Sequence, residues 1–284
     1  MCECIELGLI TIATSLLIVF VANILEKRFT TDISIVSAWL FSFMFSFPLA
    51  MYLNINPVFL FQKKTFPKMF FPFLVLLLGF SAFAYYVQKH ASLETRRKFY
   101  HIWGGVLIIF ATYFDIELSI VFIAGIEAIL IVMDYARKRR GYIAELSRKF
   151  LNPGLREDEK EGIAEAAIFF VLSVFFAYWF GWDVGSAVVV VLAFGDTFAN
   201  YGGRAFGKHR YPWGKKSVEG TVCGFIVSVI GIKLIGFPIE VAFVVSSISM
   251  AVESLEFHSD NATVPLVALV TLLAVGKGVI YSIF

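Results

Sequence analysis

Long apolar stretches recur along almost the whole chain, and they constrain the fold more than any other feature of the sequence. A segment that crosses lipid alone must satisfy its backbone polar groups internally, so each stretch is expected to be helical. We therefore predict an all-α fold, a polytopic transmembrane helical bundle of about 8–10 spans. The candidate spans are residues 5–25, 34–53, 69–87, 101–114, 117–133, 163–181, 184–200, 219–236, 239–256 and 264–283.

The amino-acid composition supports this prediction. Hydrophobic residues make up 59% of the 284 residues and charged residues 16%, whereas roughly 25% of an average soluble domain is charged. A soluble protein of this length could not bury so much apolar surface, which excludes a soluble globular class. The first apolar stretch has an acidic start, which is typical of a membrane span and not of a cleaved signal peptide.

Lysine and arginine are distributed unevenly between the loops on the two sides of the predicted bundle. With the N-terminus outside, the inside loops hold 19 of the 24 Lys and Arg residues, and the outside loops hold three. Cytoplasmic loops of membrane proteins show this bias. We therefore expect the polar motifs described below to lie on the cytoplasmic side. In the loop 134–162 we expect a short amphipathic helix that lies on anionic headgroups.

The polar motifs are confined to the part of the chain that follows residue 88. Residues 1–88 contain about three spans with ordinary loops, and we interpret them as an N-terminal transmembrane extension. Residues 89–284 contain every motif-like cluster, and we interpret them as the working membrane domain.

The first cluster, ETRRKFYHIWGG, stands at the start of a span. On a helix, Arg97 and Lys98 share a face with His101, because they are four and three residues away from it. Two cations and a titratable imidazole at a span end suit an anion such as phosphate. The alternative is a positively charged anchor with an interfacial histidine.

The second cluster, GDTFANYGGRAFGKHRYPWGKKSVEGT, follows an uninterrupted apolar run. Asp196 and Asn200 are one helical turn apart, so both can face the same point. An ionised Asp near lipid is costly unless it pairs with a cation or binds a metal. Mg²⁺ takes one or two carboxylates together with phosphate oxygens, so a magnesium site is one explanation of Asp196.

The glycine-rich basic loop after Asp196 has the composition of a polyphosphate-binding segment, although it is not a Walker A loop. Its glycines allow backbone N–H groups to approach phosphate oxygens, and Ser217 can donate a hydroxyl at the start of the next helix. The competing interpretation is a flexible basic loop beside lipid headgroups. The glycines are Gly202, Gly203, Gly207 and Gly214, and the cations are Arg204, Lys208, Arg210, Lys215 and Lys216.

The third cluster, AVESLEFHSDNATVPL, is acidic where the other inside loops are basic. Glu253, Glu256 and Asp260 are spaced by three and four residues. We expect them to face the basic loop or a metal. The alternative is an acidic turn in which Asn261 or Thr263 caps the last helix.

In this order, RRKFYH, the glycine-rich basic stretch and VESLEFHSDNATVPL resemble the motifs of the membrane-bound CTP-dependent lipid kinases. This family includes dolichol kinase, phytol kinase and a CTP-using diacylglycerol kinase, and it is related to the CDP-diacylglycerol synthases. The resemblance covers about residues 90–270. It implies transfer of the γ-phosphate of CTP to the hydroxyl of a polyprenol-type (dolichol-like) or diacylglycerol-type lipid. A divalent cation, Mg²⁺ or another, would be required, and no nucleic acid is expected as a partner.

The resemblance also implies roles for individual residues. Asp196, His101 and Lys216 would be catalytic, and Asp196 would bind metal together with Asp260 and Asn261. The nucleotide-binding residues would be Arg97, Lys98, Asn200, Gly203, Arg204, Gly207, Lys208, Lys215, Lys216, Ser217, Glu219 and Gly220.

Two other functions are compatible with parts of the sequence. A phosphatidate cytidylyltransferase would use the same CTP-binding parts, but the signature that ends the synthase branch is not found here, which favours a kinase. An ion-coupled transporter could use Glu127, Glu165 and Glu253 as an ion path, but we find no inverted repeat.

Overall fold

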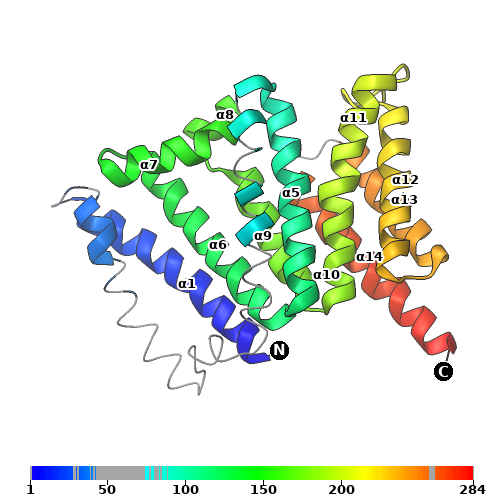
Figure 1. The fold of residues 1–284 in the computed structure, drawn as a ribbon, viewed down its shortest axis with the longest axis horizontal. Helices are drawn as coiled ribbons and strands as arrows, with labels where there is room; N and C mark the ends of the chain where they lie inside the picture. The colour runs from blue at the N-terminus through cyan, green and yellow to red at the C-terminus, as the bar shows by residue number, and fades with distance from the viewer. Residues whose placement is uncertain are drawn as a thin grey trace. The chain divides into compact units, whose positions relative to one another are not determined.

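The computed structural model describes residues 2–27, 89–255 and 260–283, together with positions 30, 32–38, 40, 42, 74–76, 78–79, 83 and 85–87. Within these residues the regular elements are helical, and the β pairing is one isolated bridge between Arg210 and Ser217. The helices, shown in Figure 1, are α1 (Cys2–Leu25), α5 (Leu93–Phe114), α6 (Ile116–Arg137), α7 (Tyr142–Leu151), α8 (Glu157–Glu161), α9 (Glu165–Tyr178), α10 (Trp182–Val189), α11 (Asp196–Phe206), α12 (Val218–Ile235), α13 (Ile239–Ser254) and α14 (Asp260–Ile283).

The predicted all-α, polytopic transmembrane bundle is confirmed. Four segments of the described chain are long and apolar enough to cross a membrane: Ile5–Leu25, Ile116–Arg137, Trp182–Phe206 and Val218–Ile235. Shorter apolar helices cover Glu165–Tyr178 and Asp260–Val275. The spans expected at 34–53 and 69–87 lie largely outside the described residues, as does much of the predicted extension 1–88.

The chain divides into two compact units. The first comprises Met1–Arg97 and Phe114–Leu172, and the second comprises Lys98–Tyr113 and Ser173–Phe284. The predicted boundary near residue 88 rests on a different criterion, the point where polar motifs begin, and it stays a prediction.

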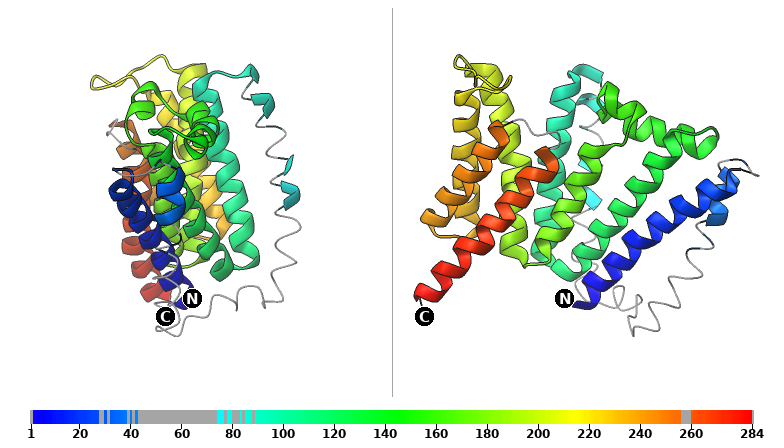
Figure 2. Two further views of the ribbon diagram at one scale, coloured as in Figure 1. Left: turned by 90° about the vertical axis from the view of Figure 1, so that its left-hand side faces the viewer. Right: turned by 180° about the vertical axis from the view of Figure 1, so that it is seen from behind.

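In the first unit, α1 packs along α6, as Figure 1 and the right-hand view of Figure 2 show. Ile18 and Ala22 of α1 are buried against Ala136 of α6. The ends of these helices are tied by Glu26, whose Oε2 accepts hydrogen bonds from Tyr135 Oη at 2.9 Å and from Arg139 Nε at 2.8 Å. The pairing fixes the direction in which the chain leaves α6.

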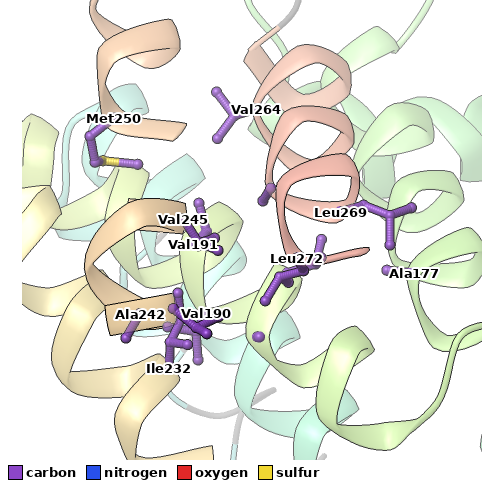
Figure 3. Packing of buried hydrophobic residues seen from close by; sticks show 14 residues of the cluster. Ala177, Val190, Val191, Ile232, Ala242, Val245, Met250, Val264, Leu269 and Leu272 are labelled. Atoms are coloured by element: carbon purple, nitrogen blue, oxygen red, sulfur yellow. The ribbon is translucent and has the colours of Figure 1, made fainter. Parts of the chain in front are cut away.

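In the second unit, small and branched side chains from the run Trp182–Gly195 and from α12, α13 and α14 form the core. Figure 3 shows Val191, Ile232, Val245 and Leu272 converging between these helices. Lipid tails are as apolar as these side chains, so helix association in a membrane depends on close packing more than on a hydrophobic driving force.

Several glycines allow close packing between helices. A Cβ added to Gly220 of α12 would lie 2.6 Å from the carbonyl oxygen of Ala199, and one added to Gly224 would lie 2.7 Å from that of Gly195. On α5, a Cβ at Gly105 would lie 2.7 Å from Cβ of Ala193. Larger side chains at these points would separate the helices that carry the polar clusters.

The helix that contains Asp196 is longer than predicted. A π-helical turn, Val190–Gly195, joins α10 to α11, and the helical run ends at Phe206 instead of at about residue 200. The predicted loop from 201 to 218 is therefore wrong at its start, since its first six residues are helical. In this extension Gly202 packs closely against Cys223, where an added Cβ would meet the sulfur at 2.5 Å.

Candidate functional site

Asp196 lies at a break in the helical geometry of the second unit. Asp196 is the first residue of α11, directly after the π-helical turn, and it is 6% exposed. Single π-helical turns within α-helices occur frequently at functional sites. A carboxylate with so little contact with water requires a nearby positive charge.

Lys98 of α5 supplies that charge. Its Nζ donates a hydrogen bond of 2.6 Å to Oδ2 of Asp196, and both side chains are nearly buried. One turn later on α5, Nδ1 of His101 lies 3.6 Å from the same oxygen. The first and second sequence clusters therefore meet at Asp196, and of the two explanations offered for a buried Asp, pairing with a cation is observed.

The loop from Gly207 to Ser217 is a short hairpin and not an open cradle. Its arms are joined by the bridge between Arg210 and Ser217, and Tyr211 N donates to the Lys216 carbonyl at 3.1 Å. Trp213, at the tip, stacks on Tyr211 and donates its indole N–H to the carbonyl oxygen of Ser254 at 3.0 Å. The hairpin is thus attached to the C-terminal end of α13.

Lys216 forms the second attachment of the hairpin. Its Nζ lies 2.7 Å from Oε1 of Glu253 and 2.8 Å from Oδ2 of Asp260, and it also donates to the carbonyl oxygen of Glu253. Burial favours the neutral amine, but the carboxylates of Glu253 and Asp260 outweigh it and raise the pKa of Lys216 above its ordinary value. For Glu253 and Asp260, the expectation that the acids of the third cluster face the basic loop is confirmed, while Glu256 lies outside the described residues.

The ion pairs at Asp196 and Lys216 belong to one charged site. The charge of Asp196 acts on both Glu253 and Asp260, and that of Lys98 acts on Asp260. We call these five residues the charged centre: Lys98, Asp196, Lys216, Glu253 and Asp260. Because it contains more carboxylates than lysines, the centre has an excess of negative charge while His101 is neutral.

The other predicted cations lie outside the charged centre. Arg204 on α11 and Lys208, Arg210 and Lys215 in the hairpin are exposed. Arg210 donates to the carbonyl oxygen of Lys215 within the hairpin. The second unit therefore combines a largely buried acidic centre with exposed basic side chains on the adjoining hairpin and helix end, two features that suit a metal-bound polyphosphate.

Ser217 and Glu219 form the start of α12. The hydroxyl of Ser217 accepts a hydrogen bond from Gly220 N at 3.2 Å and caps the helix. Glu219 accepts from the backbone N–H of His209 at 3.2 Å, and its Oε1 lies 2.6 Å from Nδ1 of that histidine. Both residues hold the hairpin on the helix N-terminus, and their predicted nucleotide contacts stay predictions.

The structure gives several predicted site residues a packing position. Gly203 lies against Ser217 and Gly220 inside the α11–α12 contact, and Gly207 ends α11.

The predicted polar residues lie on three different helices. Asn200 stands one turn after Asp196 on α11, and Arg97 is buried on α5. Asn261 is buried at the start of α14, where its carbonyl oxygen accepts from Ser173 Oγ at 3.0 Å.

Sequence reasoning missed three contacts of the site: Lys98 with Asp196, Trp213 with Ser254, and His209 with Glu219. The first had a usable signal, since a buried Asp predicts a buried cation and Lys98 shares a helix face with His101. The other two depend on how the hairpin folds back, for which the sequence contains no periodic pattern.

No group of three or more His, Cys, Asp or Glu side chains that could hold a metal ion occurs among the described residues. The predicted ligands Asp196 and Asp260 are each held by a lysine instead. Among the other buried acids of the described chain, Glu127 in α6 has two carboxylate oxygens without a hydrogen-bond partner.

Comparison with known proteins finds three relatives in two groups. The chain is 27% identical to human dolichol kinase over 216 residues and 26% identical to mouse dolichol kinase over 216 residues. It is 30% identical to the phytol kinase of a Synechocystis strain over 192 residues. No family model and no solved structure matches the chain.

The matched regions differ in how much of each relative they cover. They include 66% of this chain but only 39% and 40% of the human and mouse dolichol kinases. For the phytol kinase they include 61% of this chain and 76% of the relative. The chain thus spans about two fifths of the dolichol kinases and about three quarters of the phytol kinase that it matches.

Proposed function

Because the chain belongs to the polyprenol and phytol kinase family, we propose that it is a membrane lipid-alcohol kinase. It transfers the γ-phosphate of CTP to the hydroxyl of a polyprenol-type (dolichol-like) lipid, or of a diacylglycerol-type lipid. The proposed active site is the charged centre and the hairpin, on the cytoplasmic face of the membrane.

One observation carries this proposal beyond the family relationship. Three clusters that are far apart in the sequence contribute to one site: Lys98 from the first, Asp196 from the second, and Asp260 from the third, through Lys216. Structural ion pairs alone would not require an adjoining hairpin with several exposed cations. Phosphoryl transfer needs both the charged centre and the cations of the hairpin, since its catalysis is mainly positioning of the reactants and neutralisation of charge.

The residues of the charged centre fit a divalent cation. Oδ1 of Asp260 is buried and has no hydrogen-bond partner, and the carboxylates outnumber the lysines. A magnesium site does not need three protein ligands, because Mg²⁺ commonly binds one or two carboxylates and takes its other ligands from phosphates and water. We propose Asp196 and Asp260 as ligands, with Asn261 beside them. When bound, the cation would neutralise charge on the transferred phosphoryl group.

The cations of the hairpin would bind the polyphosphate. Arg204, Lys208 and Lys215 have exposed side chains that can turn toward phosphate oxygens. Lys216 keeps its charge because Glu253 and Asp260 surround it. Its neighbours Ser217 and Gly220 stand at the N-terminus of α12, where backbone N–H groups and the helix dipole favour anions.

His101 is the proposed acceptor of the proton from the lipid hydroxyl. Its Nδ1 faces Asp196 at 3.6 Å, so an imidazolium formed by proton transfer would be stabilised by that carboxylate. A positioned base of this kind contributes typically about 10²–10⁴-fold to a rate. The lipid would reach the site sideways from the bilayer, since long apolar alcohols do not leave the membrane.

The experiment that tests this function uses purified protein in lipid vesicles with CTP labelled at one of two positions. Label from the γ-phosphate in the lipid product indicates a kinase. Label from the α-phosphate indicates a cytidylyltransferase, in which a lipid phosphate attacks the α-phosphorus and pyrophosphate leaves. A panel of polyprenols, phytol and diacylglycerol identifies the acceptor, and absence of label from every lipid refutes both.

A further inference from the structure

Helix α7 carries an exposed apolar stripe that is not part of the charged centre. Tyr142, Leu146 and Phe150 are 74%, 41% and 67% exposed. They are four residues apart, so they lie on one side of the helix. The opposite side is packed, because Ala144 and Ser147 are buried. The helix therefore has one face for its own protein and a second apolar face directed away from it.

The position of α7 on the first unit is fixed by polar contacts. Asp32 caps its start, accepting hydrogen bonds from Tyr142 N at 2.8 Å and Ile143 N at 3.0 Å. Arg148 returns to the end of α6, where it donates to the carbonyl oxygens of Arg137 at 2.9 Å and Arg139 at 2.7 Å. The exposed stripe is thus held in one orientation.

The end of α6 places α7 at a membrane surface. α6 is an apolar helix of 22 residues, about 33 Å long at 1.5 Å per residue, which matches a hydrocarbon core of roughly 30 Å. Its last residue, Arg137, is then at the boundary between lipid and water, and α7 begins shortly afterwards. In Figure 1 and in the right-hand view of Figure 2, α7 turns away from the direction of α6.

Exposed cations stand beside the stripe. Arg140 precedes α7, and Lys149 lies on it next to Phe150, both exposed, whereas Lys138 is paired with Asp134 at 3.1 Å. Glu145 is the one exposed acid of α7 among these described residues. An apolar stripe with aromatic residues and flanking cations is typical of a helix that lies in the interface of an anionic membrane.

We propose that α7 is an interfacial docking helix whose partner is the anionic lipid surface at the membrane face where α6 ends. Tyr142, Leu146 and Phe150 insert at the boundary between headgroups and acyl chains, and the flanking cations contact anionic headgroups. This inference does not depend on the proposed enzymatic function. It assigns to α7 a role in setting the depth and tilt of the first unit in the membrane.

The test places an environment-sensitive fluorophore on α7 of the full-length protein. Cys2, Cys4 and Cys223 are replaced by serine, and a single cysteine for labelling is introduced as Phe150→Cys or, as the matched control, Glu145→Cys. The protein is reconstituted in vesicles of phosphatidylcholine and phosphatidylglycerol that contain a lipid with a nitroxide at an upper acyl position. We expect blue-shifted emission at position 150 and quenching at least about twofold stronger than at position 145.

Two results of the labelling experiment would overturn the proposal. Emission typical of water at position 150 would show that the stripe is solvated. Blue-shifted emission that the nitroxide lipid does not quench would show that a protein, such as a second copy of this chain, covers it. The charge contribution is tested by Arg140→Gln with Lys149→Gln, which should reduce quenching in mixed vesicles and not in vesicles of phosphatidylcholine alone. A double variant that is quenched as strongly as the parent in the mixed vesicles would refute recognition of anionic lipid.

Discussion

Nζ of Lys98 lies 2.6 Å from Oδ2 of Asp196, although 98 positions separate the two residues in the chain. The contact joins the start of α5 to the helical break before α11. It explains how an ionised carboxylate is tolerated within the candidate span Trp182–Phe206. Lys98 is therefore the counterion of Asp196, and it would have to leave that carboxylate, or share its charge with it, to bind a phosphate.

Lys98→Met should destabilise the protein by about 3–5 kcal/mol, because it leaves a buried carboxylate without its partner. The measurement is thermal or denaturant unfolding in detergent, with Lys89→Met as a control at an exposed position outside the site. Adding Asp196→Asn to Lys98→Met should recover part of the loss. A Lys98→Met protein as stable as the parent would contradict the buried ion pair.

Lys216→Met should release the hairpin from α13 and α14. The charge on Glu253 then lacks its partner, and the remaining contact at the tip is that of Trp213 with Ser254. We expect amide hydrogen exchange across residues 207–217 to accelerate by about tenfold or more, because opening no longer breaks an ion pair. Lys208→Met, which removes an exposed charge of the same hairpin, should leave the exchange of these amides nearly unchanged. Equal exchange in both variants would show that Lys216 does not anchor the hairpin.

Gly224→Ala should weaken the contact between α11 and α12. The new methyl group would lie 2.7 Å from the Gly195 carbonyl oxygen and 2.9 Å from Cβ of Ala199, so the helices must move apart, at a cost of about 1–3 kcal/mol. Gly125→Ala is the matched control, since a Cβ there meets nothing within 4 Å. Unfolding measured in the same detergent should separate the two variants. Equal stability would mean that the helices are not closely packed at this glycine.

Divalent cations should bind at the charged centre in the absence of any lipid substrate. Mn²⁺ serves as a spectroscopic substitute for Mg²⁺, and its electron paramagnetic resonance signal reports the bound fraction with CTP present. Asp260→Asn removes the carboxylate whose Oδ1 has no hydrogen-bond partner, and we expect it to weaken Mn²⁺ binding by about tenfold or more. Glu240→Gln, at the other end of α13, is the control. Unchanged binding in Asp260→Asn would remove this residue from the metal site.

The sequence predicted most of the membrane helices because their lengths follow from the thickness of the bilayer. The span expected at 117–133 is α6, Ile116–Arg137, and that expected at 219–236 is α12, Val218–Ile235. It also predicted that the acids around Glu253 face the basic loop or a metal, and Glu253 and Asp260 do contact Lys216 of that loop. Local composition is sufficient for conclusions of this kind.

What the sequence could not predict depends on contacts between helices. Gly202 and Gly203 look like parts of a flexible loop, yet they lie within α11 and pack against Cys223 and Gly220 of α12. The π-helical turn before Asp196 leaves no pattern in a uniformly apolar run. The pairing of Trp213 with Ser254 likewise requires the position of α13. Each of these features depends on how the helices pack against one another, and the local sequence does not specify that packing.

The most direct test of the account compares Asp196→Asn with Asp183→Asn in the transfer of γ-labelled phosphate from CTP to a lipid alcohol. Both changes remove a carboxylate from the same helical run, but Asp183 is exposed at its opposite end. With both proteins folded and reconstituted in vesicles, we predict that Asp196→Asn loses transfer by about 10²-fold or more, while Asp183→Asn keeps the parent rate. Full transfer by a folded Asp196→Asn protein would contradict the assignment of the charged centre as the active site.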